Sequence, residues 1–473
     1  MKKFTKILLI GCLLVTVSCN NWLDVDPKSQ VKDKDLFASE MGFKEALSGV
    51  YSLMTKEALY GKELTFGWLG VLGQEWTSVP YNYEDDQKYD FENAASEVRI
   101  DSVWTGLYNA IANANKLLKE LEGKENLFSG DNYFIIKGEV LALRAYLHFD
   151  LLRIFGASCT VGMERIAIPY VTEYAPTIFP QEKVGDFVGK VLKDLQDAAK
   201  CLENDPILTG RTVSEIDDNG YLMNRQVHLN YYAVKGLMAR VYLYKGDYAN
   251  AEVCAKEVIG SGCFEWVKQE NLTNESVADL TFSTEHLFAL NIVTLGNIVD
   301  KYLDGGNNSF ALEESRLSEY YGSSYDYRYL YLFKTGVGMS NTLRYLKKYD
   351  QLESVSWAQS YRNKLPLICL PEMYYILAEC RYHSSGDVLE PLNEVCRHRG
   401  VADLSEADLS AFETLLLAEY RKEVIGGGQL FFQYKRLNRF VVPGTDVDLA
   451  GEGRYVIPMP KEELENPGWV SNQ

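Results

Sequence analysis

The stretch that decides the fold runs from His228 to Cys263 and reads HLNYYAVKGLMARVYLYKGDYANAEVCAKEVIGSGC. Small and aromatic residues recur in it at helical spacing, which predicts two amphipathic helices joined at Gly246 and Asp247. A glycine allows the tight reversal of the chain, and an aspartate directly after it can cap the second helix. Because one hairpin cannot bury its own apolar face, it needs stacked neighbours. The stretch therefore predicts a stack of helical hairpins.

The turn of this hairpin resembles a known repeat motif. Gly246, Asp247, Tyr248 and Ala251 give the pattern G-[DN]-Y-x-x-A of a tetratricopeptide repeat. We expect a mostly α-helical fold, built as a tetratricopeptide-like stack of hairpins that carries an inserted irregular, mixed lobe with short strands. Apolar periodicity predicts the other helices at 37–54, 102–121, 133–155, 181–203, 371–382 and 389–398, and one within 405–426.

Residues 264–366 differ from the rest, because helical periodicity falls and Gly, Asn, Ser and Tyr become frequent. Short strands are predicted at 287–290 and 343–345, and alternating tyrosines at 325–331 predict one face of another. β-branched residues predict a further strand at 166–172. The expected organisation is a helical region at 35–263, the inserted lobe at 264–366, and C-terminal helices with an irregular tail at 367–473.

Composition indicates a folded, acidic protein. Hydrophobic residues make up 47% of the 473 residues and aromatics 12%, which suits a substantial core. The net charge of −18 argues against nucleic acid and against an anionic membrane surface as direct partners. The seven cysteines after Cys19 match neither a zinc site nor a disulfide framework, so we expect small buried thiols. A disulfide between Cys254 and Cys263 is the alternative.

The N-terminus has the pattern of an export signal. Residues 1–6 are basic, 7–17 form an apolar run too short to span a bilayer, and Cys19 follows directly. This resembles a bacterial lipobox, with a signal peptide at 1–18 and a lipidated tether at 19–34. Acyl chains such as palmitate on Cys19 would then anchor the protein. The alternative is an ordinary secretory signal with an incidental cysteine.

Ordered motifs along the chain resemble the SusD/RagB family of bacterial outer-membrane lipoproteins over essentially the full length. The motifs are C-x-x-x-L-D-x-x-P at 19–27, W-x-x-L-Y-x-x-I-x-x-A-N at 104–115, G-E-x-x-x-L-R-A at 138–145, D-x-R at 326–328, E-x-x-x-x-x-A-E at 372–379 and P-x-P-x-x-E-x-x-N-P at 458–467. The chain departs from the family where Gly427, Leu430 and Gln433 replace an acid, an Arg and an Asp, and where Cys369 and Cys396 replace Arg. We therefore expect a lost buried ion network without a lost function.

The resemblance implies a cell-surface lipoprotein of the outer membrane that acts as a hinged lid on a TonB-dependent β-barrel importer of the SusC/RagA kind. Such a protein takes part in nutrient uptake by capturing oligosaccharides, or peptides in the RagB branch, and delivering them to the barrel. The alternatives are a peptide-capturing lid and a helical-repeat scaffold that binds no small ligand. No enzyme is expected, because the five histidines are scattered and no G-x-S-x-G, H-E-x-x-H or phosphate loop occurs. No metal or cofactor is expected either.

Family ligand sites lie on the surface formed by the early aromatic loop and the inserted lobe. Here the resemblance implies as ligand-binding residues Trp68, Trp76, Tyr81, Tyr83, Tyr320, Tyr321, Tyr325 and Tyr327. Aromatic faces offer broad apolar contact, and tyrosine hydroxyls can bond to sugar hydroxyls or peptide groups. The alternative is that many of these aromatic side chains belong to the core.

Overall fold

The computed structural model describes residues 34–211, 213, 220–274, 277–336, 342–351 and 361–472. The predicted signal peptide, Cys19 and the tether as far as residue 33 lie outside these ranges. Within them, no helix combines the length and apolar character needed to cross a membrane.

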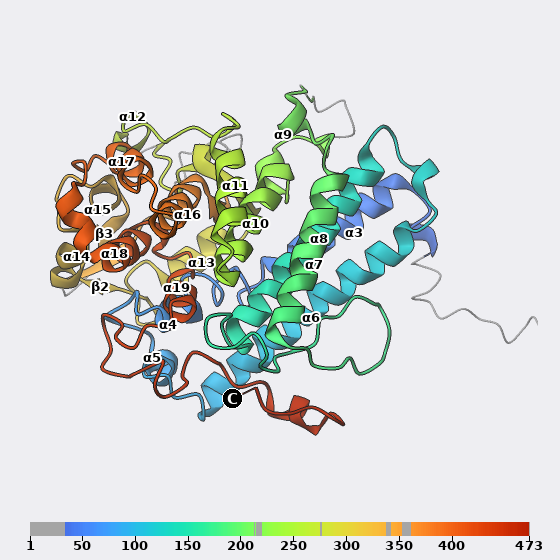
Figure 1. The fold of residues 1–473 in the computed structure, drawn as a ribbon, viewed down its shortest axis with the longest axis horizontal. Coiled ribbons are helices and arrows are strands. Elements are labelled where there is room, and N and C mark those ends of the chain that lie inside the picture. The colour runs from blue at the N-terminus through green and yellow to red at the C-terminus, as the bar shows by residue number, and fades with distance from the viewer. Residues whose placement is uncertain are drawn as a thin grey trace, which may run out of the picture.

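Most of the described chain is a stack of packed helices, so the predicted mostly α-helical fold is confirmed. Its N-terminal members are α3 (Glu40–Met54), α6 (Ala94–Leu121), α7 (Asn132–Phe155), α8 (Val184–Cys201), α10 (Tyr231–Lys245) and α11 (Tyr248–Ile259). Helix α7 packs between α6 and α8, and Figure 1 shows these three helices side by side. Helix α8 also packs on α10, which continues the stack.

The hairpin of α10 and α11 forms as its sequence predicts. Gly246 adopts a left-handed conformation with φ of 80°, which glycine takes without strain. The Asp247 side chain caps α11 by accepting a hydrogen bond from the backbone N–H of Asn250 at 3.2 Å. Gly236 serves packing, because a Cβ atom there would lie 2.8 Å from the Leu287 side chain.

The C-terminal helices extend the same stack. They are α16 (Leu370–His383), α17 (Leu389–His398), α18 (Phe412–Val424) and α19 (Leu430–Arg436). Helix α16 packs against α11 although the inserted residues separate them in sequence. The tail then folds back on α7, where the Ile457 N–H donates to the Ile154 carbonyl at 3.2 Å.

Two small sheets form in the region that was expected to contain strands, and one of them extends beyond it to Cys369. Strand β1 (His286–Asn291) pairs with β5 (Lys364–Cys369), and β2 (Leu312–Glu313), β4 (Leu343–Leu346) and β3 (Phe333–Thr335) form a sheet in that order, all antiparallel. The strands predicted at 287–290 and 343–345 are confirmed.

Two other strand predictions are wrong. The tyrosine-rich segment forms a short helix, α15 (Tyr327–Tyr331), because the Asp326 side chain caps it by accepting from the Arg328 N–H. This local cap outweighs the alternating pattern. At 166–172 the chain makes only an isolated bridge between Ile166 and Lys183.

Short helices lie in several of the segments between these elements. They are α4 (Trp68–Leu72), η2 (Tyr81–Tyr83), α5 (Glu84–Gln87), η3 (Glu125–Leu127), α9 (Pro206–Thr209), η5 (Arg225–Val227), α12 (Glu270–Thr273), η6 (Ser283–Glu285), α13 (Leu295–Tyr302), α14 (Glu314–Tyr321), η7 (Glu406–Ala411) and η8 (Lys461–Glu465). The cysteines of the described ranges are free, and Cys263 is exposed while Cys254 is buried, so the alternative of a disulfide between them is wrong.

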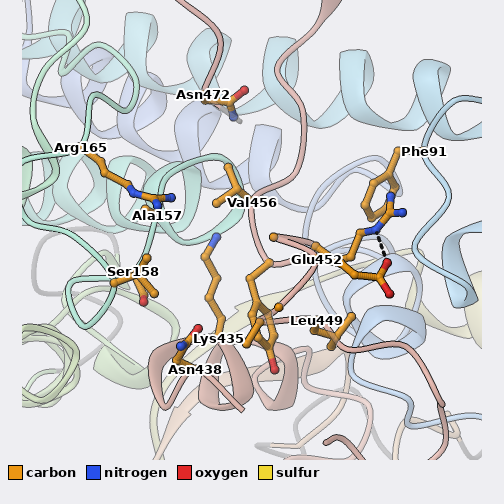
Figure 2. Close-up of a pocket in the computed structure, with 16 residues that line it drawn as sticks. Phe91, Ala157, Ser158, Arg165, Lys435, Asn438, Leu449, Glu452, Val456 and Asn472 are labelled. Atoms are coloured by element: carbon orange, nitrogen blue, oxygen red, sulfur yellow. Dashed lines mark hydrogen bonds and ion pairs between the residues drawn. The ribbon is translucent and has the colours of Figure 1, made fainter. Parts of the chain in front are cut away.

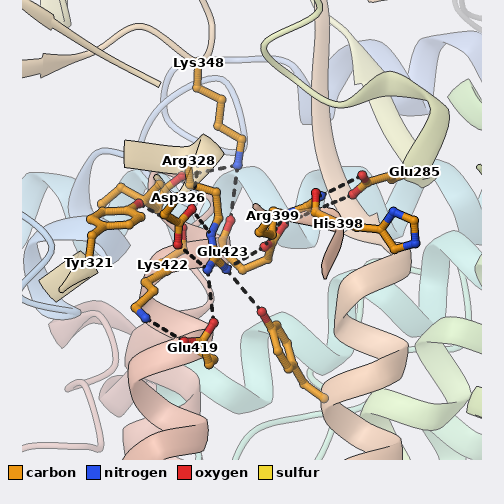
Figure 3. A network of polar contacts seen from close by, with 12 residues as sticks. Glu285, Tyr321, Asp326, Arg328, Lys348, His398, Arg399, Glu419, Lys422 and Glu423 are labelled. Atoms are coloured by element: carbon orange, nitrogen blue, oxygen red, sulfur yellow. Dashed lines mark hydrogen bonds and ion pairs between the residues drawn. The ribbon is translucent and has the colours of Figure 1, made fainter. Parts of the chain in front are cut away.

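A buried ion network joins the inserted lobe to the C-terminal helices (Figure 3). Arg328 contacts Asp326 at 2.7 Å, Glu419 at 3.1 Å and Glu423 at 3.0 Å. Arg399 bonds to the other oxygen of Glu423 at 2.8 Å. Two guanidinium groups thus neutralise the carboxylate of Glu423 inside the fold. This network contains none of the positions at which the chain departs from the family, so the loss of an ion network at those positions stays a prediction.

One of the departing positions also keeps its polar role. Gln433, which stands where the family has an Asp, accepts hydrogen bonds from Arg436 at 2.9 and 3.1 Å. Arg436 is in turn paired with Glu379 at 2.6 Å. The amide oxygen thus takes the place of a carboxylate oxygen, while the charge of Arg436 is balanced by Glu379.

A second buried network centres on Glu139 of α7. Its carboxylate accepts from Tyr51 of α3 at 2.9 Å and from Arg225 at 2.6 Å, and His228 lies at 2.9 Å. Burial by itself would raise the pKa of Glu139, but Arg225 and His228 outweigh it and lower the pKa to about 2. The network therefore ties α3, α7 and the segment before α10 together through a carboxylate that must stay ionised.

The pKa of Glu139 predicts how its contribution to stability depends on pH. Because its folded pKa lies below the ordinary value of 4.5, the contribution is complete above pH 4.5 and is lost as the pH falls towards 2. We expect Glu139→Gln to lower the free energy of unfolding by about 3 kcal/mol at pH 7, and this difference to shrink by about 2 kcal/mol at pH 3. Urea unfolding from pH 7 to pH 3 measures both.

The matched control for Glu139→Gln is Glu120→Gln, which removes a half-exposed pair with Lys124 at 3.0 Å. Exposed pairs of this kind contribute roughly 0–1 kcal/mol, so this variant should stay close to wild type at each pH. A difference for Glu139→Gln that is the same at pH 7 and pH 3 would contradict the assigned pKa.

Candidate ligand-binding site

The early aromatic loop and the inserted lobe are joined directly. The Ala311 N–H donates to the Ser78 carbonyl at 3.0 Å, and the Glu313 N–H donates to the Thr77 hydroxyl at 2.7 Å. Beneath these bonds the ring of Phe310 packs on Trp76, with centroids 5.9 Å apart. Residues that lie far apart in the sequence therefore form one continuous surface.

Arg421 of α18 fastens this surface to the C-terminal segment. Its guanidinium donates to the Gln74 carbonyl at 3.0 Å, to the Tyr434 hydroxyl at 2.5 Å and to the Pro443 carbonyl at 3.4 Å. The ring of Tyr320 covers the same guanidinium at 4.2 Å. One buried cation therefore joins two loops and helix α19. Because Tyr320 is half-buried, the same cation also positions an aromatic ring at the border with solvent.

The turn that carries Tyr81 is held from below by a buried cluster. Arg99 of α6 forms an ion pair with Asp86, donates to the Asn82 carbonyl at 3.0 Å, and lies over the ring of Tyr83 at 3.9 Å. Burial raises the pKa of Asp86 to about 6, although Arg99 acts in the opposite direction. The cluster fixes the backbone of η2 while leaving its first side chain outside.

The structure separates the predicted aromatic residues into two groups. Tyr81 is 87% exposed and Tyr325 is 76% exposed. Tyr320 and Tyr327 are half-buried, and Tyr327 packs on Tyr331 with ring centroids 6.1 Å apart. These four side chains are the ones that a ligand can reach on the folded chain.

The other four aromatic residues predicted to contact a ligand cannot do so, because their side chains are buried in the core. Those with an exposure of 5% or less are Trp68, Trp76, Tyr83 and Tyr321. Their polar atoms are used internally: Trp76 donates to the Phe66 carbonyl at 2.7 Å, and Tyr321 donates to the Lys422 carbonyl at 3.1 Å. Replacing a buried Trp with Ala costs about 3–5 kcal/mol, so these positions stabilise the fold.

Sequence reasoning missed other side chains near this surface. Phe440 and Val441 are exposed in the loop that Arg421 holds through Pro443. Trp266 of the lobe stacks on His398 of α17 with ring centroids 4.6 Å apart, and it borders a groove of about 420 Å³ that Tyr327 also lines. These residues lie in irregular segments, where no periodicity distinguishes an exposed side chain from a buried one.

The surface offers aromatic faces and hydrogen-bonding groups. Within the described ranges, no group of three or more His, Cys, Asp or Glu side chains is placed to hold a metal ion. Its chemistry therefore suits a neutral, hydroxyl-rich or peptide-like ligand that stacks on rings.

The known proteins that this chain resembles carry one family name, SusD-like. Residues 21–243 match the SusD-like_3 family model, described as "Starch-binding associating with outer membrane". SusD-like protein P38 of Formosa agariphila is 24% identical over 269 residues, which are 56% of this chain and 47% of that protein. SusD-like protein P25 of the same organism is 24% identical over 33% of this chain and 31% of its own length. The chain thus spans about half the length of the first relative and a third of the second.

Solved structures match over a larger share of the chain. A SusD superfamily protein from Bacteroides thetaiotaomicron aligns with a TM-score of 0.74 at 22% identity, covering 92% of this chain and all of that one (100%). A protein described as "Laminarin binding SusD-like protein" aligns with a TM-score of 0.62 at 18% identity, covering 91% and 100%. At such identities these matches show the fold.

Proposed function

Because residues 21–243 match the SusD-like_3 family model, we propose that the chain is a surface-exposed lipoprotein of the outer membrane that captures oligosaccharides. The description of the matched family as starch-binding and associated with the outer membrane supports this role. The laminarin binding named for a protein of the same fold supports a glucan or a related glycan as ligand. We propose further that the captured glycan is delivered to a TonB-dependent β-barrel importer.

The proposed binding surface consists of Tyr81, Tyr325 and the half-buried rings of Tyr320 and Tyr327. The observation that carries this location is the 87% exposed ring of Tyr81 on a turn that the Arg99 cluster holds in place. A ring that is already positioned loses little conformational freedom when a sugar stacks on it, so more of the contact energy appears as affinity.

A peptide is the alternative ligand, since the same rings and hydroxyls suit peptide groups. The remaining alternative is a scaffold that binds no small ligand. Glycan-array and peptide-pool binding to the purified chain distinguish these possibilities: selective glycan binding supports the proposal, peptide binding alone supports the alternative lid, and no binding supports a scaffold.

Removing an exposed ring should weaken glycan binding without affecting folding. We expect Tyr81→Ala and Tyr325→Ala each to raise the Kd for the best array glycan roughly tenfold, which corresponds to about 1.4 kcal/mol. Calorimetric titration measures the Kd, and thermal unfolding checks that the fold is intact. The control is Tyr174→Ala, which removes a 49% exposed tyrosine on a different loop. If both variants bind like wild type, the proposed surface is wrong.

The lipid anchor is tested at Cys19, outside the described residues. Cys19→Ala removes the thiol that acylation needs, so the variant should leave the membrane fraction and partition into the aqueous phase of a detergent separation. Cys263→Ala is the control, because it removes an exposed thiol elsewhere. If Cys19→Ala stays in the membrane fraction as wild type does, Cys19 is not the anchor and the predicted lipobox is wrong.

The partner is tested by purification from native membranes under mild detergent. We expect a β-barrel importer to copurify with the wild-type chain, because capture and delivery require the two proteins to be in contact. Repeated recovery of the chain by itself, with Cys19 acylated, would count against delivery while leaving glycan binding unaffected.

A further inference from the structure

A cavity of about 540 Å³ lies where three segments meet (Figure 2). Its walls come from the loop after α7, from the end of α19, and from the tail segment at 449–456. Neither Tyr81 nor Tyr325 lines it, so it is distinct from the proposed glycan surface. Small-molecule sites have volumes of roughly 300–1,000 Å³, so this cavity has room for a ligand of sugar size.

The charged side chains that line the cavity are mainly cationic. They are Arg165, Lys435, Arg454 and Glu452. Glu452 is already paired with Arg454 at 3.2 Å, which leaves the charges of Lys435 and Arg165 without a carboxylate of the wall. Figure 2 shows the ammonium of Lys435 and the guanidinium of Arg165 turned towards the same space. On a chain of net charge −18, this is a local positive field.

The amine of Lys435 is buried in a place that offers little compensation for a positive charge. Its side chain is 1% exposed, and among the described residues its ammonium has one hydrogen-bond acceptor, the Ile154 carbonyl at 3.1 Å. An ammonium offers three donors, so two N–H bonds are available. Burial, aided by Arg153, lowers the pKa of Lys435 well below its ordinary value. A buried cation of this kind is stabilised when an anion pairs with it.

Ser158, in the same wall of the cavity, is a second buried polar residue without a full set of hydrogen bonds. Its side chain is 2% exposed, and its hydroxyl has no hydrogen-bond partner within the described part of the chain. The loop is built around this residue, since its carbonyl accepts from the N–H groups of Val161 and Gly162 at 3.1 Å. Buried hydroxyl groups are rarely left unsatisfied, so the position is suited to a bonding partner inside the cavity.

We propose that this cavity is a second binding site, for an oxyanion carried by a molecule no larger than a small sugar, such as the carboxylate of a hexuronic acid. Lys435 and Arg165 supply the positive charge, and the hydroxyl of Ser158 donates a further hydrogen bond. A purely structural role for Lys435, as the cap of the C-terminal turn of α7, accounts for one of its donors. That role does not explain why the hydroxyl of Ser158 lacks a hydrogen-bond partner among the described residues. It also does not explain why the guanidinium of Arg165 points into the cavity.

The test is calorimetric titration of the purified full chain with glucuronate, glucose and sodium sulfate at constant ionic strength. Glucuronate should bind saturably and glucose should not, because they differ in the carboxylate. Sulfate binding would indicate that a free oxyanion suffices, whereas binding of glucuronate without sulfate would indicate that the sugar contributes. Both results support an oxyanion site.

The variants show whether the anion occupies this cavity. We expect Ser158→Ala and Arg165→Met each to weaken glucuronate binding roughly fivefold to tenfold, as the loss of one hydrogen bond to a charged group predicts. Lys435→Met should abolish binding, and thermal unfolding shows whether this buried substitution still folds. Lys256→Met, which removes a half-exposed lysine of α11, controls for a change in net charge.

Three results would overturn the proposal. They are the absence of binding by both anions, unchanged binding in Ser158→Ala and Arg165→Met together, and an equal loss in Lys256→Met. The proposal does not rest on glycan capture, so Tyr81→Ala should bind glucuronate like wild type. If one of the two proposed sites is wrong, the test of the other site still holds.

Discussion

The carboxylate of Glu423 between Arg328 and Arg399 is the interaction on which the arrangement of the lobe depends. It joins residues of the lobe, of the segment after α17 and of α18, and Arg399 continues the network to Glu285 at 2.5 Å. Removing one member of a buried pair costs about 3–5 kcal/mol, because the remaining charge is left without a partner. The network therefore favours one position of the lobe on the helical stack and penalises others.

Helix α18 transmits this constraint to the surface. Glu419 and Glu423 are four residues apart and so lie on one face, where both contact Arg328. Arg421 lies on a different face and holds the Gln74 carbonyl and the ring of Tyr320. A single helix thus fixes the lobe on one side and the early aromatic loop on the other. Tyr81 and Tyr320 are consequently carried by segments that buried cations hold in place, as a preformed binding surface requires.

The two proposed sites differ in their chemistry. The tyrosine surface presents rings and hydroxyl groups, which suit a neutral polar ligand that stacks. The cavity around Lys435 and Ser158 presents buried donors and positive charge, which suit an anion. An acidic protein repels anions over most of its surface. A local excess of cationic side chains therefore favours anion binding in the cavity, although the net charge of the chain is negative.

The sequence by itself determined the features that depend on local interactions. The turn at Gly246, the cap at Asp247 and the boundaries of α17 follow from residues close together in the chain, and periodicity marked the helices of the stack. The ordered motifs from 104–115 to 458–467 indicated the family, because each motif is carried by one short segment. The N-terminal pattern around Cys19 likewise remains a prediction from sequence.

Only the tertiary structure decided which aromatic side chains face solvent and which charges are paired. Tyr81 and Tyr83 are two residues apart in η2, yet the first is exposed and the second packs against Arg99 of α6. Similarly, Lys435 and Ser158 meet in one cavity only because α19 packs near the end of α7. Burial and charge pairing are set by contacts between remote segments, and a local sequence pattern carries no information about those contacts.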